Sequence, residues 1–99
     1  DLAVMHTAWC FETGRFDPAV SDAILNGYCS TFELDVPTRD ALPILLRGAC
    51  LRFLLTRCYD WINTPVNALV TRKDPLAFLR RLNFYSDDDN IALIMGQLR

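Results

Sequence analysis

Histidine is nearly absent from this chain, which has only His6, and its four cysteines never occur in close pairs. Because a zinc site usually takes four nitrogen or sulfur ligands in tight local pairs, the sequence predicts no metal site. The four glycines are too scattered to form a phosphate-binding loop. The aspartate run at 87–89 resembles a calcium loop only superficially, since Ala92 stands where the sharp turn needs glycine. We interpret the run as a helix cap.

An excess of charge of one sign is also lacking, because ten basic residues face twelve acidic ones and the net charge is -2. This balance favours neither nucleic acid nor an anionic membrane surface as a partner. The longest apolar segment is interrupted by Arg47, Arg52 and Arg57, so it falls short of the roughly 18 apolar residues of a membrane span. The first residues show no secretory signal. We therefore expect neither a nucleic-acid nor a membrane partner.

The four cysteines each lie within an apolar run, at positions 10, 29, 50 and 58. A free thiol in such surroundings behaves as a small hydrophobic group. The sequence therefore predicts buried, reduced thiols and a cytoplasmic location, with two disulfides as the alternative.

Apolar residues are abundant, at 52% of the chain, which is enough for the core of a single domain over 1–99. Apolar positions recur at helical spacing, and no convincing period-two strand pattern is present. The sequence therefore predicts an all-α helical bundle. The expected elements are helices at residues 1–11, 18–32, 43–62, 75–85 and 91–98, a connector at 35–38 and an irregular segment at 66–73. Pro43 either opens the long helix or kinks the chain after a short helical turn that follows the connector.

The segment 47–62 is apolar nearly all round, so we expect other helices to enclose it. Its Arg47, Arg52 and Arg57 point in three different directions at about 100° per residue. From the residues alone, we expect the three arginines to form ion pairs between helices. Arg57 also has the right spacing to pair with Asp60 on the same helix. Recognition of an anionic group is the alternative, because a guanidinium holds a carboxylate or phosphate through two parallel hydrogen bonds.

Three ring-bearing side chains are candidate functional residues. His6 follows Leu2 by one turn on an apolar face and is expected to be a packed core histidine. Trp9 and Trp61 are expected in the core, with a ligand platform as the alternative. No nucleophile and base can be combined from the pattern, so the sequence predicts no catalytic residue.

A family resemblance rests on residues 42–63, LPILLRGACLRFLLTRCYDWIN, which are similar to the late helix of bacterial homoserine kinases of the aminoglycoside-phosphotransferase-like type. Flanking matches follow in the same order: DLA at 1–3, AWCFE at 8–12, ALV at 68–70, KDPL at 73–76 and RRL at 80–82. The resemblance covers roughly residues 1–84. After Phe84 the sequence departs from the family's pattern.

The resemblance implies an enzyme that phosphorylates the hydroxyl of L-homoserine with ATP and Mg²⁺, in threonine biosynthesis. This chain would be the last third, the C-terminal part of the helical lobe in a kinase-like fold. The catalytic loop and the metal-binding aspartate would lie before Asp1, in an N-terminal kinase portion that would be the chain's partner. Phosphoryl transfer depends on those parts, so this chain alone is predicted inactive. A lobe without its neighbours is expected to expose apolar surface and self-associate.

In the family, this region helps to shape the acceptor pocket for homoserine, a small zwitterion. By charge complementarity, the carboxylate would suit Arg47 or Arg52, and the ammonium would suit Glu12 or Asp60. Trp9 completes the substrate-binding residues that we predict.

Asp1, Arg57 and Trp61 are predicted to be structural, and by the resemblance Asp1 would brace the catalytic loop. Two other functions remain open. One is a related small-molecule kinase that acts on an aminoglycoside, choline or methylthioribose. The other is a free-standing helical interaction module without catalytic activity.

Overall fold

The fold, taken from a computed structural model, is described for residues 1–65, 67–69 and 71–98. Within these residues all regular structure is helical, which confirms the predicted all-α class. The elements are α1 (Leu2–Trp9), α2 (Pro18–Thr31), α3 (Val36–Asn63), α4 (Leu76–Tyr85) and α5 (Asp88–Gln97). Of the irregular segment expected at 66–73, residues 66 and 70 lie outside the described residues, and the others form no helix or strand.

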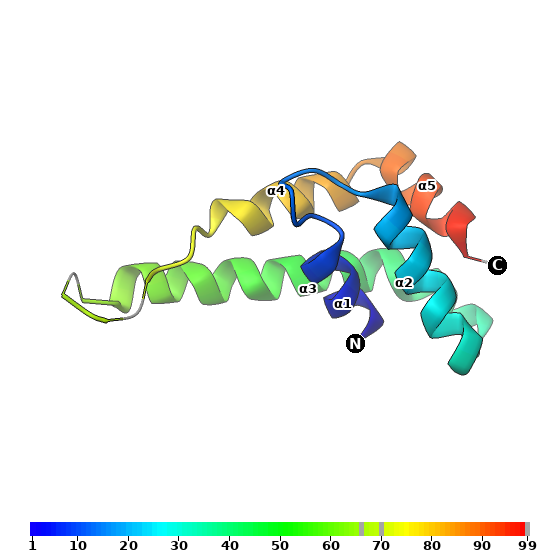
Figure 1. Cartoon of the computed structure of the whole chain (residues 1–99), viewed down its shortest axis with the longest axis horizontal. Coiled ribbons are helices and arrows are strands. Elements are labelled where there is room, and N and C mark those ends of the chain that lie inside the picture. Colours follow the sequence, from blue (N-terminus) through cyan, green and yellow to red (C-terminus); the bar gives the residue numbers. More distant parts are fainter. Residues whose placement is uncertain (66, 70, 99) are drawn as a thin grey trace.

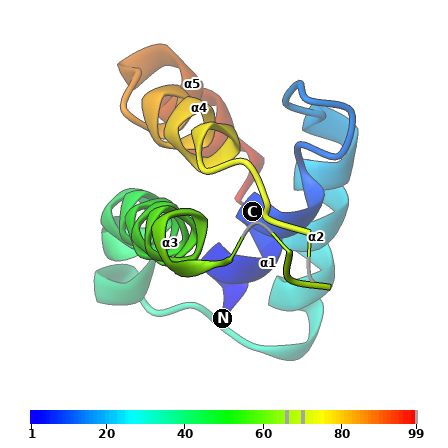
Figure 2. The same ribbon diagram turned by 90° about the vertical axis from the view of Figure 1, so that its left-hand side faces the viewer.

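The long helix α3 sets the shape of the molecule, which measures 48 × 27 × 25 Å. Figure 1 shows α4 running antiparallel along α3, with α1 packed across the middle of α3. Helices α2 and α5 pack against each other at the end where α3 begins. Figure 2, viewed along α3, shows that the other helices gather on one side of it. The opposite side of α3 is therefore left uncovered.

Aspartate side chains cap the starts of α2, α3 and α5. The Asp17 carboxylate accepts hydrogen bonds from the backbone N–H groups of Ala19 and Val20, and Pro18 occupies the first turn of α2. Asp87 likewise accepts from the N–H of Asn90. Asp1 precedes α1 in the capping position, but its side chain makes no capping hydrogen bond.

Helix α3 begins earlier than predicted. Its first turn is capped by Asp35, which accepts from the N–H of Thr38 at 2.9 Å, and it continues through Pro43. A proline inside a helix costs about 3 kcal/mol. Leu42 and Leu46 flank Pro43 and are almost fully buried, and each buried leucine contributes about 1.5–3 kcal/mol. The free energy of burying these leucines thus offsets the cost of the proline. The residues next to Pro43 in the sequence do not reveal this burial.

The core lies where α1, α2, α4 and α5 meet the first half of α3. Its fully buried side chains include Leu25, Leu46, Tyr85 and Ile94. Among its aromatic contacts, Phe16 stacks on Phe84 with ring centroids 4.5 Å apart. His6 has no exposed surface, which confirms the predicted core histidine.

Other helices do not enclose α3 on all sides, which corrects the expectation from the sequence. Large apolar side chains remain exposed along one side of the helix because no other element packs there. We call this set the α3 stripe, and it consists of Ile44 (65% exposed), Leu51 (47%), Leu55 (60%), Tyr59 (67%) and Ile62 (80%).

All four cysteines are free, and Cys10 and Cys50 are fully buried as predicted. Cys29 and Cys58 are only half-buried, which corrects the expectation for these two. Over the described part of the chain, no helix combines the length and the apolar character that a membrane span requires.

Candidate functional site

A buried chain of hydrogen bonds connects the two ends of the sequence. His6 Nδ1 lies 2.7 Å from the Tyr85 hydroxyl, and His6 Nε2 lies 2.7 Å from Ser21 Oγ. The Ser21 hydroxyl donates to Gln97 Oε1 at 2.5 Å, and the Gln97 amide donates to the carbonyl of Pro18 at 3.0 Å. Side chains of α1, α2, α4 and α5 are therefore joined in one network.

This network contains a serine beside a histidine, as a catalytic nucleophile and its base do. Its protons, however, are not arranged for the histidine to accept the serine proton. Gln97 Oε1 can only accept, so the single hydroxyl proton of Ser21 is directed at it. His6 Nε2 must then donate to Ser21, and Nδ1 must accept from Tyr85. His6 cannot take the serine proton in this state, and neither Ser21 nor His6 is exposed. Burial also lowers the pKa of His6 to about 4. The network is structural.

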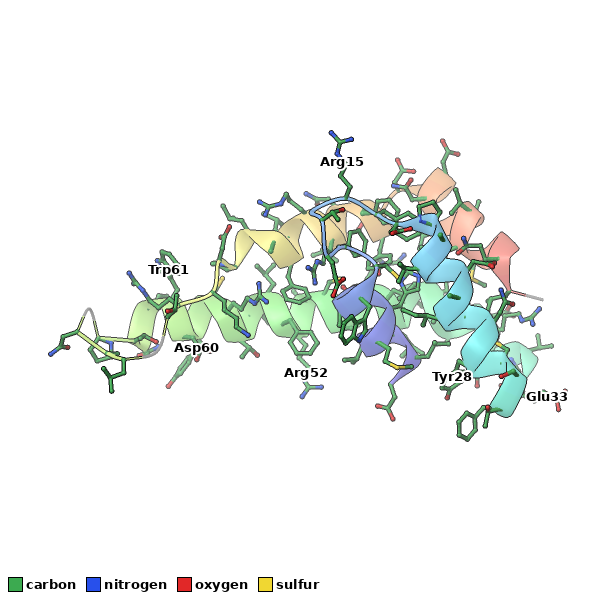
Figure 3. The ribbon with its side chains drawn as sticks, viewed as in Figure 1. Arg15, Tyr28, Glu33, Arg52, Asp60 and Trp61 are labelled. Carbon is green, nitrogen blue, oxygen red and sulfur yellow. The ribbon has the colours of Figure 1, made fainter. Side chains whose placement is uncertain are left out.

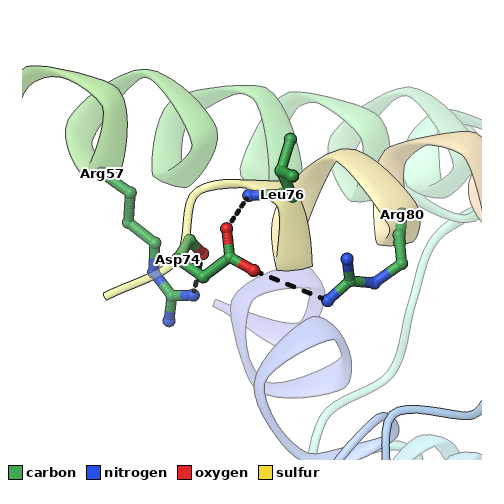
Figure 4. Close-up of polar contacts among 4 residues, drawn as sticks. All are labelled: Arg57, Asp74, Leu76 and Arg80. Atoms are coloured by element: carbon green, nitrogen blue, oxygen red, sulfur yellow. Dashed lines mark hydrogen bonds and ion pairs between the residues drawn. The ribbon is translucent and has the colours of Figure 1, made fainter. Parts of the chain in front are cut away.

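Arg57 does not pair with Asp60, which corrects one expectation from helical spacing. Its Nη1 donates to the backbone carbonyl of Asp74 at 3.0 Å, and its guanidinium lies 4.4 Å from the centre of the Phe78 ring. As Figure 4 shows, the Asp74 carboxylate accepts from the N–H of Leu76 and faces Arg80 at 4.0 Å. Arg57 thus contacts a backbone carbonyl and an aromatic ring rather than a carboxylate.

Arg81 adds a second cation beside the same ring. Its guanidinium lies 4.6 Å from the centre of Phe78, and Nη1 donates to the carbonyl of Thr7 at 2.8 Å. Burial, followed by the nearby charge of Arg57, lowers the pKa of Arg81. Two guanidinium groups therefore lie within 5 Å of one phenyl ring. Of the salt bridges found in the described residues, none involves Arg57 or Arg81.

Two hollows adjoin at the second half of α3 and share Arg57, Asp60 and Lys73. The inner hollow, of about 290 Å³, lies between α1, α3 and the start of α4, and it is lined by Thr7, Ala8, Phe53, Thr56, Arg57, Asp60, Lys73 and Phe78. The outer hollow, of about 440 Å³, lies at the C-terminal end of α3, and it is lined by Arg57, Asp60, Asn63, Thr64, Pro65, Ala68, Thr71, Arg72 and Lys73. Groups of both charges therefore meet where the two hollows join.

A third hollow, the α1–α3 groove, has a volume of about 440 Å³ and a mostly apolar lining from α1, α2 and α3. Arg52 and Asp1 bring charges to this groove, and the rest of its lining includes Leu2, Leu42 and Leu45. Figure 3 shows Arg52 and Asp60 extending from the same side of α3, but they line different hollows.

The structure does not gather the predicted substrate-binding residues into one site. Arg52 lines the groove and Asp60 lines the two adjoining hollows, whereas Arg47, Glu12 and Trp9 line none of the hollows described above. Trp9 is 56% exposed, which contradicts the core expectation because α1 presents that side to solvent.

Trp61 is also outside the core, at 44% exposed, because it lies on the half of α3 that the bundle leaves uncovered. The Arg72 guanidinium stacks 4.3 Å from its ring and donates to the Trp61 carbonyl. Trp61 therefore contacts the segment after α3 through Arg72.

Lys73 and Thr56 are two polar residues of the inner hollow that the sequence did not lead us to expect there. Lys73 precedes the Asp74–Pro75 helix start, and nothing local indicates that this segment folds back beside α3. Thr56 is one turn before Asp60, so a search for polar residues sharing a helix side with Asp60 would have found it. Among the described residues, no group of three or more His, Cys, Asp or Glu side chains could hold a metal ion.

Comparison with known proteins gives a consistent picture. No protein-family model matches the chain, so the wider aminoglycoside-phosphotransferase-like placement stays a prediction. The homoserine kinases of Gluconobacter oxydans and Gluconacetobacter diazotrophicus are each 52% identical to it, over 92% and 93% of this chain. That of Acidiphilium cryptum is 55% identical over 86%. The chain spans less than a third of these relatives, 29%, 29% and 27% of their lengths. The chain is therefore a relative of the homoserine kinases, and it corresponds to a C-terminal part of their sequence.

Proposed function

We propose that this chain forms the C-terminal, acceptor-side helical part of a homoserine kinase, an enzyme that transfers a phosphoryl group from ATP to the hydroxyl of L-homoserine. The observation that carries the proposal is the identity of 52–55% to homoserine kinases over 86–93% of the chain. The all-α fold and the charged hollows beside Asp60 support it.

The proposal divides the reaction between two parts of the enzyme. ATP and Mg²⁺ bind to the kinase portion outside the 29% of the relatives' length that this chain spans. Positioning of the acceptor hydroxyl is the task of the helical part, because phosphoryl transfer is catalysed chiefly by positioning and charge stabilisation. Residues 1–99 then act as one helical subdomain in the cytoplasm, and the isolated chain is inactive.

Packing against the kinase portion accounts for the α3 stripe. Contiguous exposed apolar surface of this kind typically marks an interface. Leu55 and Ile62 are 60% and 80% exposed although they lie on the longest helix. In the complete enzyme, we expect the kinase portion to cover this side of α3.

A chimera tests the proposal directly. The segment of the Gluconobacter oxydans homoserine kinase that aligns with this chain is replaced by residues 1–99, and ADP release is followed with ATP and L-homoserine. The parent enzyme is the positive control, and the parent truncated before the segment is the negative control. We expect the chimera to retain homoserine-dependent activity that the truncated parent lacks. A chimera that folds and binds ATP but releases no ADP with homoserine would contradict the proposal.

The α3 stripe by itself also fits a second function, that of a free-standing helical interaction module. In that case the chain is a stable, monodisperse protein by itself and adds nothing to the truncated kinase. The same chimera, offered choline, an aminoglycoside and methylthioribose in place of homoserine, tests the related small-molecule kinases.

A further inference from the structure

We infer, in a refinement that rests on the proposed function, that the inner hollow recognises the backbone of a free α-amino acid, with Asp60 holding the ammonium and Arg57 and Lys73 holding the carboxylate. The assignment moves the carboxylate from Arg47 or Arg52, which the sequence suggests, to cations that line the same hollow as Asp60.

The charged groups of this hollow are available for a ligand. Within the part of the chain that the structure describes, the Asp60 carboxylate and the Lys73 ammonium make no hydrogen bond or ion pair with other residues. Arg57 uses one N–H on the Asp74 carbonyl. The guanidinium group carries five N–H donors, so four of them remain for a carboxylate. The inner hollow therefore offers a zwitterionic ligand one carboxylate, from Asp60, and two cations, from Arg57 and Lys73.

The charge around Phe78 favours a carboxylate at that side of the hollow. The guanidinium groups of Arg57 and Arg81 lie 4.4 Å and 4.6 Å from the centre of the Phe78 ring, and Lys73 lines the same hollow. No salt bridge neutralises these three cations within the described residues. Cations that lie together without a direct ion pair raise the local potential and attract an anionic group.

The remaining lining suits a short side chain and an ammonium. Phe53 and Phe78 stack with centroids 5.2 Å apart and provide an apolar wall. The Thr56 hydroxyl donates to the Arg52 carbonyl at 2.9 Å, so its oxygen still has a lone pair for an ammonium. At about 290 Å³, the hollow lies just below the range of typical ligand sites, roughly 300–1,000 Å³, which suits a small ligand.

The α1–α3 groove is a weaker candidate for the same ligand. Its lining is mostly apolar, with Arg52 and Asp1 as the charged residues among its thirteen lining residues. A small zwitterion would leave most of that groove empty and would gain little from its apolar lining. Groups of both charges meet more closely in the inner hollow.

The test is a ¹H–¹⁵N NMR titration of the 99-residue chain with three matched ligands. L-homoserine carries both charges, L-homoserine lactone lacks the carboxylate and 4-hydroxybutyrate lacks the ammonium. We expect saturable shifts of the amides around Thr56, Asp60 and Lys73 with L-homoserine, and at least about tenfold weaker binding of each analogue, since each loses a charge-assisted hydrogen bond. Equal binding of 4-hydroxybutyrate or inorganic phosphate would indicate a plain anion site and overturn the inference.

Two variants and a matched control locate the site. Asp60→Asn removes the acceptor charge and Lys73→Gln removes a cation, and both residues are exposed, so the fold should persist. Each should weaken L-homoserine binding about tenfold. Asp40→Asn lies on the same helix outside the hollows and should bind normally. Shifts confined to the groove around Arg52, or unchanged affinity in Asp60→Asn, would contradict the assignment.

The chimera separates failure of this inference from failure of the proposed function. If the chimera is active, Asp60→Asn should raise its KM for homoserine about tenfold and leave its KM for ATP unchanged. An active chimera with an unchanged homoserine KM would refute the site and leave the function standing. A chimera that folds and binds ATP but is inactive would refute the function, while the titration would still decide whether the hollow binds the amino acid.

Discussion

The imidazole Nδ1 of His6 lies 2.7 Å from the hydroxyl of Tyr85, although 79 residues separate them in the chain. This contact fastens α1 to α4, and the second imidazole nitrogen continues through Ser21 to Gln97 at the end of α5. A buried network in which each member is satisfied favours one arrangement of its helices. His6 therefore holds the bundle in one arrangement, in addition to filling space in its core.

Replacing His6 with leucine should destabilise the chain strongly. The variant leaves the buried Tyr85 hydroxyl without an acceptor and Ser21 without one of its partners, and an orphaned buried polar group costs about 1–3 kcal/mol. We expect the free energy of unfolding to fall by about 2–4 kcal/mol in urea denaturation. Tyr85→Phe leaves the ring in place and orphans a single buried group, His6 Nδ1, so it should cost less, about 1–2 kcal/mol. Equal losses in the two variants would contradict the shared network.

Stability should also decrease on mild acidification. Burial holds the pKa of folded His6 at about 4, against about 6.5 when unfolded. Between these values the unfolded chain binds more protons, so stability is full above pH 6.5 and is lost as the pH falls toward 4. From pH 7 to pH 5 we expect a loss of about 2 kcal/mol. His6→Gln should lack this dependence, and urea titrations at both pH values would reveal an equal loss in the variant if the histidine were not responsible.

The cysteines should react with a thiol reagent in two classes. Burial raises the pKa of Cys10 to about 12 and also raises that of Cys50, so neither forms the reactive thiolate near neutral pH. Cys29 and Cys58 are only half-buried. Ellman's reagent at pH 8 should modify Cys29 and Cys58 first, and Cys10 and Cys50 only at the rate of unfolding. Peptide mapping that finds Cys10 or Cys50 modified early would contradict the core packing.

The α3 stripe should drive self-association of the isolated chain. A change of Leu55 and Ile62 to lysine removes two of its exposed apolar side chains without disturbing the core, since both are more than half exposed. We expect sedimentation equilibrium to show an association constant reduced about tenfold or more. Leu93→Lys, at a 48% exposed position on α5, is the matched control and should associate as the parent chain does. A monodisperse parent chain would contradict this prediction and favour the free-standing module.

Local signals predicted the helix types and several boundaries well. Asp17 with Pro18, and Asp87 before the last helix, begin helices by capping, which depends on neighbouring residues alone. The early start of α3 was not predictable in this way, because Leu42 and Leu46 stabilise the helix through Pro43 only by packing against distant elements. Long-range packing outweighed the local proline signal.

The candidate site was harder to predict than the fold. Helical periodicity could show that Arg47, Arg52 and Arg57 point apart, but it could not show what each one faces. Arg57 binds the carbonyl of Asp74, seventeen residues later, because the chain after α3 turns back along it. That reversal also brings Lys73 beside Asp60. Charge complementarity therefore predicted Asp60 as a ligand-binding residue, but it did not predict that Arg57 and Lys73 line the same hollow.

The most direct measurement is homoserine-dependent ADP release by the Gluconobacter oxydans kinase that carries residues 1–99 in place of its own aligned segment. If this chain is the acceptor-side part of a homoserine kinase, the chimera should turn over L-homoserine within about tenfold of the parent kcat/KM, a difference of about 1.4 kcal/mol in transition-state stabilisation. It should show no comparable activity with choline, an aminoglycoside or methylthioribose. A folded, ATP-binding chimera without homoserine-dependent turnover, or with a preference for another acceptor, would contradict the assignment.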